Sequence, residues 1–176
     1  MSTPLAASAR PHSSLTPLGA VETVTGSKYV VEHAGRRVLV DAGLFQGLKE
    51  LRERNWAPFP VEPSSLDAVV ISHAHLDHCG FLPRLVKAGF EGDVHVTDDT
   101  GRLMSIVLPD SARLQEEEAR FANKRGYSRH DPALALYTED DAWTALDKLV
   151  PHSFGEPFEA APGITVEFRP AGHILG

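Results

Sequence analysis

Apolar and polar side chains alternate along the N-terminal part of the chain, with the two-residue period of strands that have one buried face. Farther along, the apolar, β-branched run Ala68–Ile71 does not alternate, which indicates a fully buried strand. The residues His33–Arg36 are typical of a hairpin turn. The predicted strands are residues 15–20, 27–32, 37–41, 67–72 and 93–97, with an antiparallel pair at 154–160 and 164–169.

Apolar side chains at helical spacing occupy much of the chain between these strands. The longest helical segment is 98–122, which Pro109 is expected to kink or split. A later helix is predicted to begin at Thr138–Asp141, whose residue types are typical of a helix N-terminus. The predicted helices are residues 46–55, 83–88, 98–122 and the one that starts near Thr138 and includes Trp143, Leu146 and Val150. Strands with interspersed helices predict an α/β fold.

The composition is that of an ordinary globular protein. The 176 residues suffice for one domain, and the hydrophobic content of 42% and charged content of 23% are typical of that class. No apolar run is long enough to span a membrane. Residues 1–14 lack the apolar core of a secretory signal and are expected to form a flexible tail. The missing signal and the single cysteine, Cys79, predict a cytoplasmic location.

The residues most suited to bind metal or to take part in catalysis are concentrated in the segment that follows the buried strand. It places three histidines and one aspartate within six residues, namely His73, His75, Asp77 and His78. Alternate residues of an extended turn share a side, so His73 and His75 can face one metal ion. Asp77 and His78, at the start of the next helix, can face a second ion. Imidazole with carboxylate suits zinc, manganese or iron better than calcium or magnesium.

The alternative for this segment is a run of surface histidines. Chance would produce the pattern in only about one of a thousand chains of this composition, which favours metal binding. Cys79 is expected to be a small residue at a tight turn rather than a ligand, because nitrogen and oxygen ligands are already supplied. The remaining histidines outside the motifs stand alone in the sequence and are expected at the surface or in packing: His12, His33, His95, His130 and His152.

The His-x-His-x-Asp-His pattern after a strand resembles the signature of the metallo-β-lactamase superfamily. Further motifs occur in the order seen in its β-CASP branch, and resemble the bacterial and archaeal nucleases akin to the cleavage and polyadenylation specificity factor endonuclease. The resemblance extends from about Leu15 to the last residue. Its motifs are Gly19–Ser27, Leu39–Gly47, His73–Gly80 with Leu82–Pro83, and Ala171–Gly176.

This resemblance implies an αβ/βα sandwich, of which the chain would cover about the first half. Residues 15–176 would be the N-terminal part of the metallo-β-lactamase domain, with its second half and the inserted β-CASP domain beyond Gly176. Each sheet of a sandwich buries one face against its partner, so the strands 27–32, 37–41 and 67–72 would lack a second sheet. The chain would then form a homodimer or pair with the missing C-terminal part.

The resemblance also implies metal-binding roles. His73, His75 and His173 would bind one ion, while Asp77 and His78 would bind the other. The bridging aspartate and late histidine that complete the second site in the family would lie beyond this chain. Asp77 would also orient the attacking water, as the catalytic residue. For His173 the alternative is an ordinary loop histidine.

Asp41 follows an apolar strand, and an acid at a buried strand end needs partners. The resemblance implies that it supports the ligand turn by accepting hydrogen bonds from a ligand histidine or the backbone. The alternative is an aspartate that caps the turn before Gly43.

Two divalent transition-metal ions, zinc or alternatively manganese, would activate a water and clamp phosphate oxygens. The resemblance thus implies a hydrolase that cleaves RNA, or else single-stranded DNA, as an endonuclease or exonuclease in RNA processing or decay. The alternatives are another hydrolase of the superfamily, such as a glyoxalase-II-like thioesterase, a lactonase or a β-lactamase, and an inactive truncated product.

The net charge of −7 argues mildly against nucleic-acid binding, for which a basic face is expected. Bound metal ions would offset part of this charge. A basic stretch between Arg120 and Arg129 offers a local exception, since no acid lies between Phe121 and His130. Because it adjoins the acidic run Glu116–Glu118, we favour the interpretation that it is a solvated helix surface.

Overall fold

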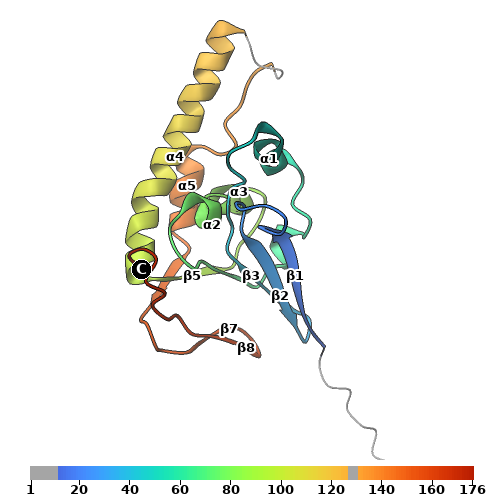
Figure 1. Ribbon diagram of the computed structural model, residues 1–176, viewed down its shortest axis with the longest axis vertical. Coiled ribbons are helices and arrows are strands. Elements are labelled where there is room, and N and C mark those ends of the chain that lie inside the picture. The colour runs from blue at the N-terminus through green and yellow to red at the C-terminus, as the bar shows by residue number, and fades with distance from the viewer. Residues whose placement is uncertain (1–11, 127–130) are drawn as a thin grey trace, which may run out of the picture.

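The computed structural model describes residues 12–126 and 131–176, and its centre is a mixed six-stranded sheet in the order β1–β2–β3–β4–β5–β6 (Figure 1). The pairs from β1 to β3 are antiparallel, and those from β3 to β6 are parallel. The strands are β1 Ser13–Gly19, β2 Lys28–His33, β3 Arg36–Val40, β4 Ala68–Val70, β5 Asp93–Thr97 and β6 Leu149–His152. Because parallel strands end at the same edge, the turns after β3 and β4 lie together there.

Side-chain alternation assigns the residues of the central strands to the two faces of the sheet. Leu39 and Val69 point to the face that the helices cover, where they share one buried cluster with Leu82 and Met104. Figure 1 shows this helical layer beside the sheet. The layer consists of α3 Leu82–Lys87, α4 Asp98–Arg125 and α5 Glu139–Leu146. Burial on both faces fixes β4 in place, and with it the turn that carries the candidate ligands.

The opposite face of the sheet is covered in part by a hairpin of two strands, β7 Phe158–Ala161 and β8 Ile164–Val166. Ile164 and Ala160 from this hairpin pack in a second buried cluster with Val38 and Val70. The expectation that the strands 27–32, 37–41 and 67–72 lack a second sheet is therefore wrong in part, since β7 contacts both β3 and β4.

Helix α4 is continuous from Asp98 to Arg125, so of the two outcomes expected at Pro109 the split is wrong, and the kink stays a prediction. Proline removes one backbone hydrogen bond from a helix interior. Here the turn around it is buried against the core, and that packing outweighs the loss. The side chain of Thr97 caps the start of the helix by accepting a hydrogen bond from the Thr100 amide. Gly126, with φ of 67°, ends it in the left-handed conformation.

Several predicted boundaries differ because short elements depend on tertiary contacts. The predicted helix 46–55 is reduced to α1, Lys49–Glu53, followed by a 3-10 turn at Arg54–Trp56. The predicted last helix ends at Leu146, and Val150 instead belongs to β6, which pairs with β5. The remaining short helical elements are α2 Leu76–Cys79 and a 3-10 turn at Pro63–Ser65.

The predicted flexible tail, residues 1–14, overlaps the described part of the chain only at its end. Strand β1 begins at Ser13 and pairs with His33 of β2, so Ser13 and Ser14 are not part of a tail. Residues 1–11 lie outside the described residues. Within the part that the structure describes, no helix has the length and apolar character needed to cross a membrane.

Candidate metal centre

Three histidine side chains from distant parts of the chain meet at the edge where the parallel strands end. His73 and His75 lie on the turn after β4, and His173 lies on the segment after β8. Nε2 of His73 is 3.0 Å from Nδ1 of His75, which in turn is 3.2 Å from Nε2 of His173. In residues 12–126 and 131–176, this is the only cluster of histidine, cysteine or carboxylate groups in which three ligand atoms lie within 4.8 Å of one another.

Two of the three separations between these nitrogens fit a transition-metal ion. Two nitrogens that bind zinc tetrahedrally at about 2.0–2.1 Å lie about 3.3–3.4 Å apart, close to the separations seen here. Burial lowers the pKa of His73, and the nearby rings of His78 and His75 add to the effect. This shift favours the neutral form of the His73 ring, the form that binds metal. His75 and His173 are exposed, which leaves the site open to a substrate.

Asp77 and His78 lie beside the histidine group, in the first turn of α2. The ring centroids of His73 and His78 are 4.0 Å apart. Nδ1 of His78 donates a hydrogen bond of 2.7 Å to Asp41, so Nε2 faces Asp77, whose Oδ2 is 3.7 Å away. The pair therefore presents one nitrogen and one oxygen to a position next to the first group, a ligand set that suits a transition metal.

Both carboxylate oxygens of Asp41 are bound to the ligand turn or to the strand beside it. Oδ1 accepts a hydrogen bond of 2.9 Å from the Ser72 amide, and Oδ2 accepts one of 2.9 Å from the Ser27 hydroxyl. Burial alone would raise the pKa of Asp41, but hydrogen bonds from His78 and Ser72 hold it below its ordinary value. The same bond to Asp41 raises the pKa of His78. These partners come from other segments, whereas a turn cap would bind the backbone near Gly43.

The residues Asp41–Phe45, here called the bracing segment, run along the back of the ligand turn. The amides of Ala42 and Leu44 donate hydrogen bonds of 2.7 and 2.9 Å to the carbonyl oxygens of two residues of α2, His78 and Leu76. Gly43 lies so close that a Cβ atom there would be 1.6 Å from the carbonyl oxygen of Asp77. The conformation of the ligand turn therefore depends on close backbone contact with this segment.

Replacing Asp41 with asparagine tests its support of the site. Asp41 has a φ of 60°, a conformation that asparagine also tolerates, so the change removes charge with little backbone strain. We expect metal affinity to fall about 10–100-fold, as for other residues that orient ligands. The pKa of His78, measured by NMR on metal-free protein, should fall because its charged acceptor is lost. Asp110→Asn, at an exposed ion pair with Arg113, is the control. Unchanged affinity and an unchanged His78 titration would contradict this role.

Other residues singled out in the sequence lie outside the site. Cys79 is fully buried, and burial raises the pKa of its thiol, which fits a packing residue. His95 and His152 are packing residues, as expected, and they lie together, with Nδ1 of His95 2.9 Å from Nε2 of His152. His152 also stacks on Phe158 at 3.6 Å between ring centroids, so this pair packs against the hairpin. Arg129 and His130 lie outside the described residues.

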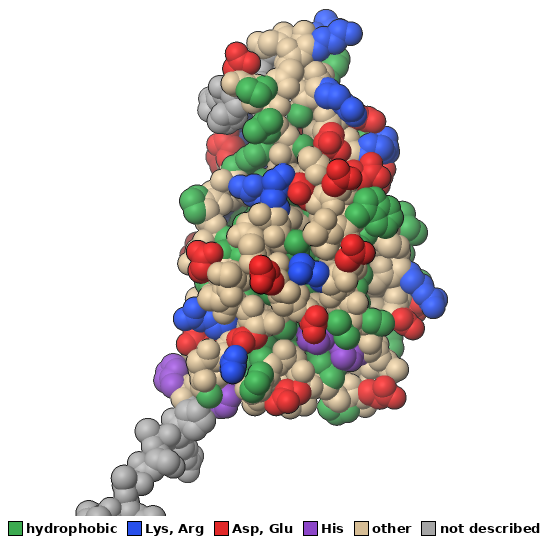
Figure 2. Space-filling model, turned by 180° about the vertical axis from the view of Figure 1, so that it is seen from behind, with side chains coloured by type: hydrophobic (Ala, Val, Ile, Leu, Met, Phe, Trp, Pro, Cys, Tyr) green, Lys and Arg blue, Asp and Glu red, His purple; other side chains and the backbone are tan. Residues whose placement is uncertain are grey.

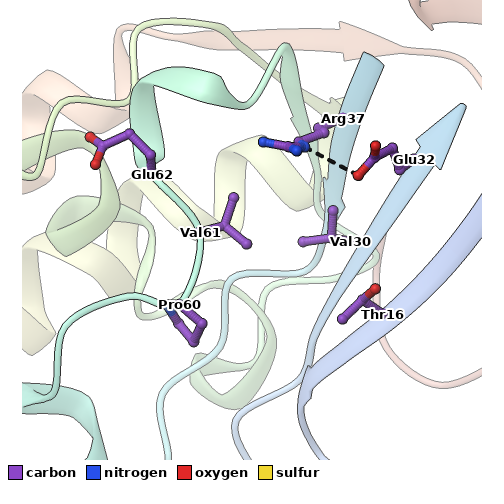
Figure 3. A pocket seen from close by; sticks show the side chains of 7 residues that line it. All are labelled: Thr16, Val30, Glu32, Arg37, Pro60, Val61 and Glu62. Atoms are coloured by element: carbon purple, nitrogen blue, oxygen red, sulfur yellow. Dashed lines mark hydrogen bonds and ion pairs between the residues drawn. The ribbon is translucent and has the colours of Figure 1, made fainter. Parts of the chain in front are cut away.

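A hollow of about 260 Å³ beside β2 is separate from this site (Figure 3). Val30 and Val61 line it, together with Glu32 and Arg37, whose side chains form an ion pair of 3.2 Å. None of the candidate ligands lines this hollow. The histidine group thus lies at an exposed edge and not in the pocket of Figure 3.

Comparison with known proteins agrees with the resemblance that the sequence motifs indicate. The family model of the metallo-beta-lactamase superfamily matches residues 23–157. Over 162 residues, the chain is 38% identical to Ribonuclease TTHA0252 of Thermus thermophilus, an alignment that covers 92% of this chain and 33% of that protein. It is 32% identical over 159 residues to Transcription termination factor FttA of Methanocaldococcus jannaschii, with 90% and 23% covered.

A eukaryotic relative is Integrator complex subunit 11 of Danio rerio, to which the chain is 27% identical over 173 residues, with 94% of this chain and 27% of that protein covered. The chain thus spans about a third, or less, of the length of these curated relatives.

Proposed function

Because the chain belongs to the metallo-beta-lactamase superfamily, we propose that it provides the metal-binding edge of a nuclease that cleaves RNA. The observation that carries this proposal is the convergence of His73, His75 and His173, with Asp77 and His78 adjacent. The similarity to proteins named as a ribonuclease and as a transcription termination factor supports RNA as the substrate. The order of the motifs along the chain supports the β-CASP branch.

The superfamily implies divalent metal ions, and we assign zinc to this site, with manganese as the alternative. His73, His75 and His173 would hold one ion through the nitrogens that converge here. His78 and Asp77 would contribute to a second ion, which needs ligands besides these two. When bound, the ions supply a deprotonated water near neutral pH and positive charge for the phosphate oxygens.

Asp77 is the residue that we propose to be catalytic. Its carboxylate lies 3.7 Å from Nε2 of His78 and is half-buried, so it can accept a hydrogen bond from an attacking water while it holds metal. In the neutral ring of His78, Asp41 keeps the proton on Nδ1, so that Nε2 carries the lone pair that can bind metal. The role of these residues in the reaction is therefore to bind the ions, to orient the attacking water and to fix the position of the proton on His78.

The charge distribution does not single out α4 as a surface for RNA. Figure 2 shows acidic and basic side chains interspersed on the face that it presents, without a continuous basic surface. On α4, Arg113 pairs with both Asp110 and Glu117. These pairs support a solvated surface for the part of the helix before the basic stretch, while the interpretation of Arg120–Arg129 itself stays a prediction. A homodimer, a pairing with further chain and a cytoplasmic location stay predictions.

The protein purified from its native source, with its intact mass measured first, is expected to hydrolyse single-stranded RNA. A chelator should abolish cleavage, and added zinc or manganese should restore it, because the ions supply the nucleophile. A DNA oligonucleotide of the same sequence separates the two nucleic acids. S-lactoylglutathione and nitrocefin serve as the comparison substrates. Turnover of either small molecule without RNA cleavage would contradict the proposed nuclease activity and favour another hydrolase activity of the superfamily.

A further inference from the structure

Lys28, the first residue of β2, is a buried cation beside the candidate metal centre. Only 3% of its surface is exposed. Its ammonium donates a hydrogen bond to the carbonyl oxygen of Gly43 and lies 4.5 Å and 4.8 Å from the ring centroids of Phe45 and Phe81. Burial lowers the pKa of Lys28 to about 8. Keeping Lys28 charged therefore lowers the stability of the folded protein.

Packing alone does not account for a lysine at this position. The contacts of its ammonium among the described residues are a carbonyl and two aromatic rings, with no carboxylate to balance the charge. A methionine would fill the same space against Phe45 and Phe81 without desolvating an ion. A buried charge that opposes folding is more often found where function needs it.

The position of Gly43 indicates what that need is. Gly43 is the middle of the bracing segment, and its amide donates a hydrogen bond of 3.0 Å to the carbonyl of Ser27. The Ser27 amide in turn donates one of 2.9 Å to the carbonyl of Asp77. Lys28 therefore binds a residue of the bracing segment whose backbone lies directly against that of Asp77, a proposed metal ligand.

We propose that Lys28 is a positioning residue for the metal centre. Its ammonium holds the carbonyl of Gly43 and thereby presses the bracing segment against the ligand turn, which sets the position of Asp77. This inference rests on the proposed metal site, and it assigns to Lys28 a role through Gly43 rather than contact with ion or substrate.

Lys28→Met is the test variant, because it keeps the length of the side chain and removes the charge and the donor. Lys28→Arg restores both, and the hollow of about 240 Å³ that Lys28 lines leaves room for the larger group. Lys49→Met is the matched control, since Lys49 is 61% exposed and lies 3.9 Å from Glu53. Co²⁺ is the probe, and its visible absorption reports both affinity and ligand geometry.

We expect Lys28→Met to bind Co²⁺ at least about tenfold more weakly than the wild type, with an altered spectrum. Its metal-free thermal stability should be unchanged or higher, because the desolvated charge is gone. Lys28→Arg should recover affinity, and Lys49→Met should match the wild type in both measurements. A residue with a merely structural role would show the opposite pattern, in which stability falls and the folded variant keeps its Co²⁺ spectrum.

The pH dependence of metal-free stability provides the second readout. The pKa of Lys28 is about 8 in the folded chain, against 10.5 for a lysine that is not buried, as in the unfolded chain. At a pH between these two values, Lys28 is protonated in the unfolded chain but not in the folded chain. Its contribution to the free energy of unfolding therefore rises as the pH increases from the lower value to the higher one. Lys28→Met should lack that rise. Arg54, at the same hollow, stays charged throughout and does not titrate here.

Three results would overturn the inference. The first is equal Co²⁺ affinity in Lys28→Met and the wild type. The second is a Lys28→Met chain that fails to fold together with a Lys28→Arg chain that folds but does not recover affinity. The third is a wild type that binds no Co²⁺ at all, which would refute the proposed metal site as well. The first two leave the metal site standing, so the failure of this inference is distinguishable from the failure of the proposed function.

Discussion

Replacing His73 with alanine is expected to remove nearly all metal from the protein. His73 contributes one of only three converging nitrogens, and its pKa is lowered by burial, so a neutral ligand is lost. The loss of affinity should exceed the 10–100-fold that is typical of residues that only support ligands. Elemental analysis after dialysis against metal-free buffer measures it. Under the proposed function, RNA cleavage should fall in parallel, because the nucleophile depends on the metal.

The fold should survive this substitution. The imidazole of His73 is only partly buried, and its neighbours at the site are other polar side chains. We expect a change in unfolding free energy of about 1 kcal/mol or less in the absence of metal. His33→Ala, at a histidine that contacts Ser13 far from the site, is the control. Equal metal content in His73→Ala and the wild type would refute the proposed ligand set.

Gly43→Ala is expected to disrupt both the fold and the metal centre. The new Cβ would lie 1.6 Å from the carbonyl oxygen of Asp77 and 2.8 Å from the amide of His78. Backbone atoms must then separate, which breaks the hydrogen bonds between the bracing segment and the turn. Overpacking costs about 1–3 kcal/mol and sometimes more. Chemical denaturation measures the stability, and Co²⁺ titration of the fraction that remains folded measures the site.

Gly101→Ala is the matched control for this clash. Gly101 lies inside α4, and a Cβ atom there would meet Val96 at 3.4 Å and Leu149 at 3.6 Å, which are ordinary contacts. In a helix interior, alanine is more favourable than glycine by about 0.5–1 kcal/mol. Gly101→Ala should therefore be neutral or stabilising and keep its metal. Equal behaviour of the two glycine variants would contradict the claim that the metal site depends on close contact between Gly43 and the ligand turn.

Local sequence patterns predicted the central strands and the family correctly. The β-branched run at Ala68–Ile71 is buried on both faces, as its lack of alternation indicates, and the superfamily is confirmed by the family model. The spacing of His73 and His75 also indicated that they share a side, and in the structure their nitrogens lie 3.0 Å apart. Such features are visible because strand period and ligand spacing are local properties of a chain.

Features that depend on tertiary contacts were missed. Nothing about a lysine at the start of a strand indicates that Lys28 is buried beneath two aromatic rings. The pairing of His95 with His152 joins residues 57 positions apart through neighbouring strands. The unbroken helix through Pro109 likewise reflects core packing that overrides local preference. The metal roles of the individual residues stay predictions.

His75 and His173 are 98 residues apart in sequence, yet their nitrogens lie 3.2 Å apart. An ion bound to both would act as a removable cross-link that closes residues 75–173, with β5, β6, the helices α2 to α5 and the hairpin β7–β8, into one ring. Closing a loop of about 100 residues takes about 4–5 kcal/mol of entropy from an unfolded chain when the link is covalent. Withdrawal of metal would thus release the segment after β8 from the turn. The availability of metal in the cell would then govern the resistance of this protein to proteolysis as well as its chemistry.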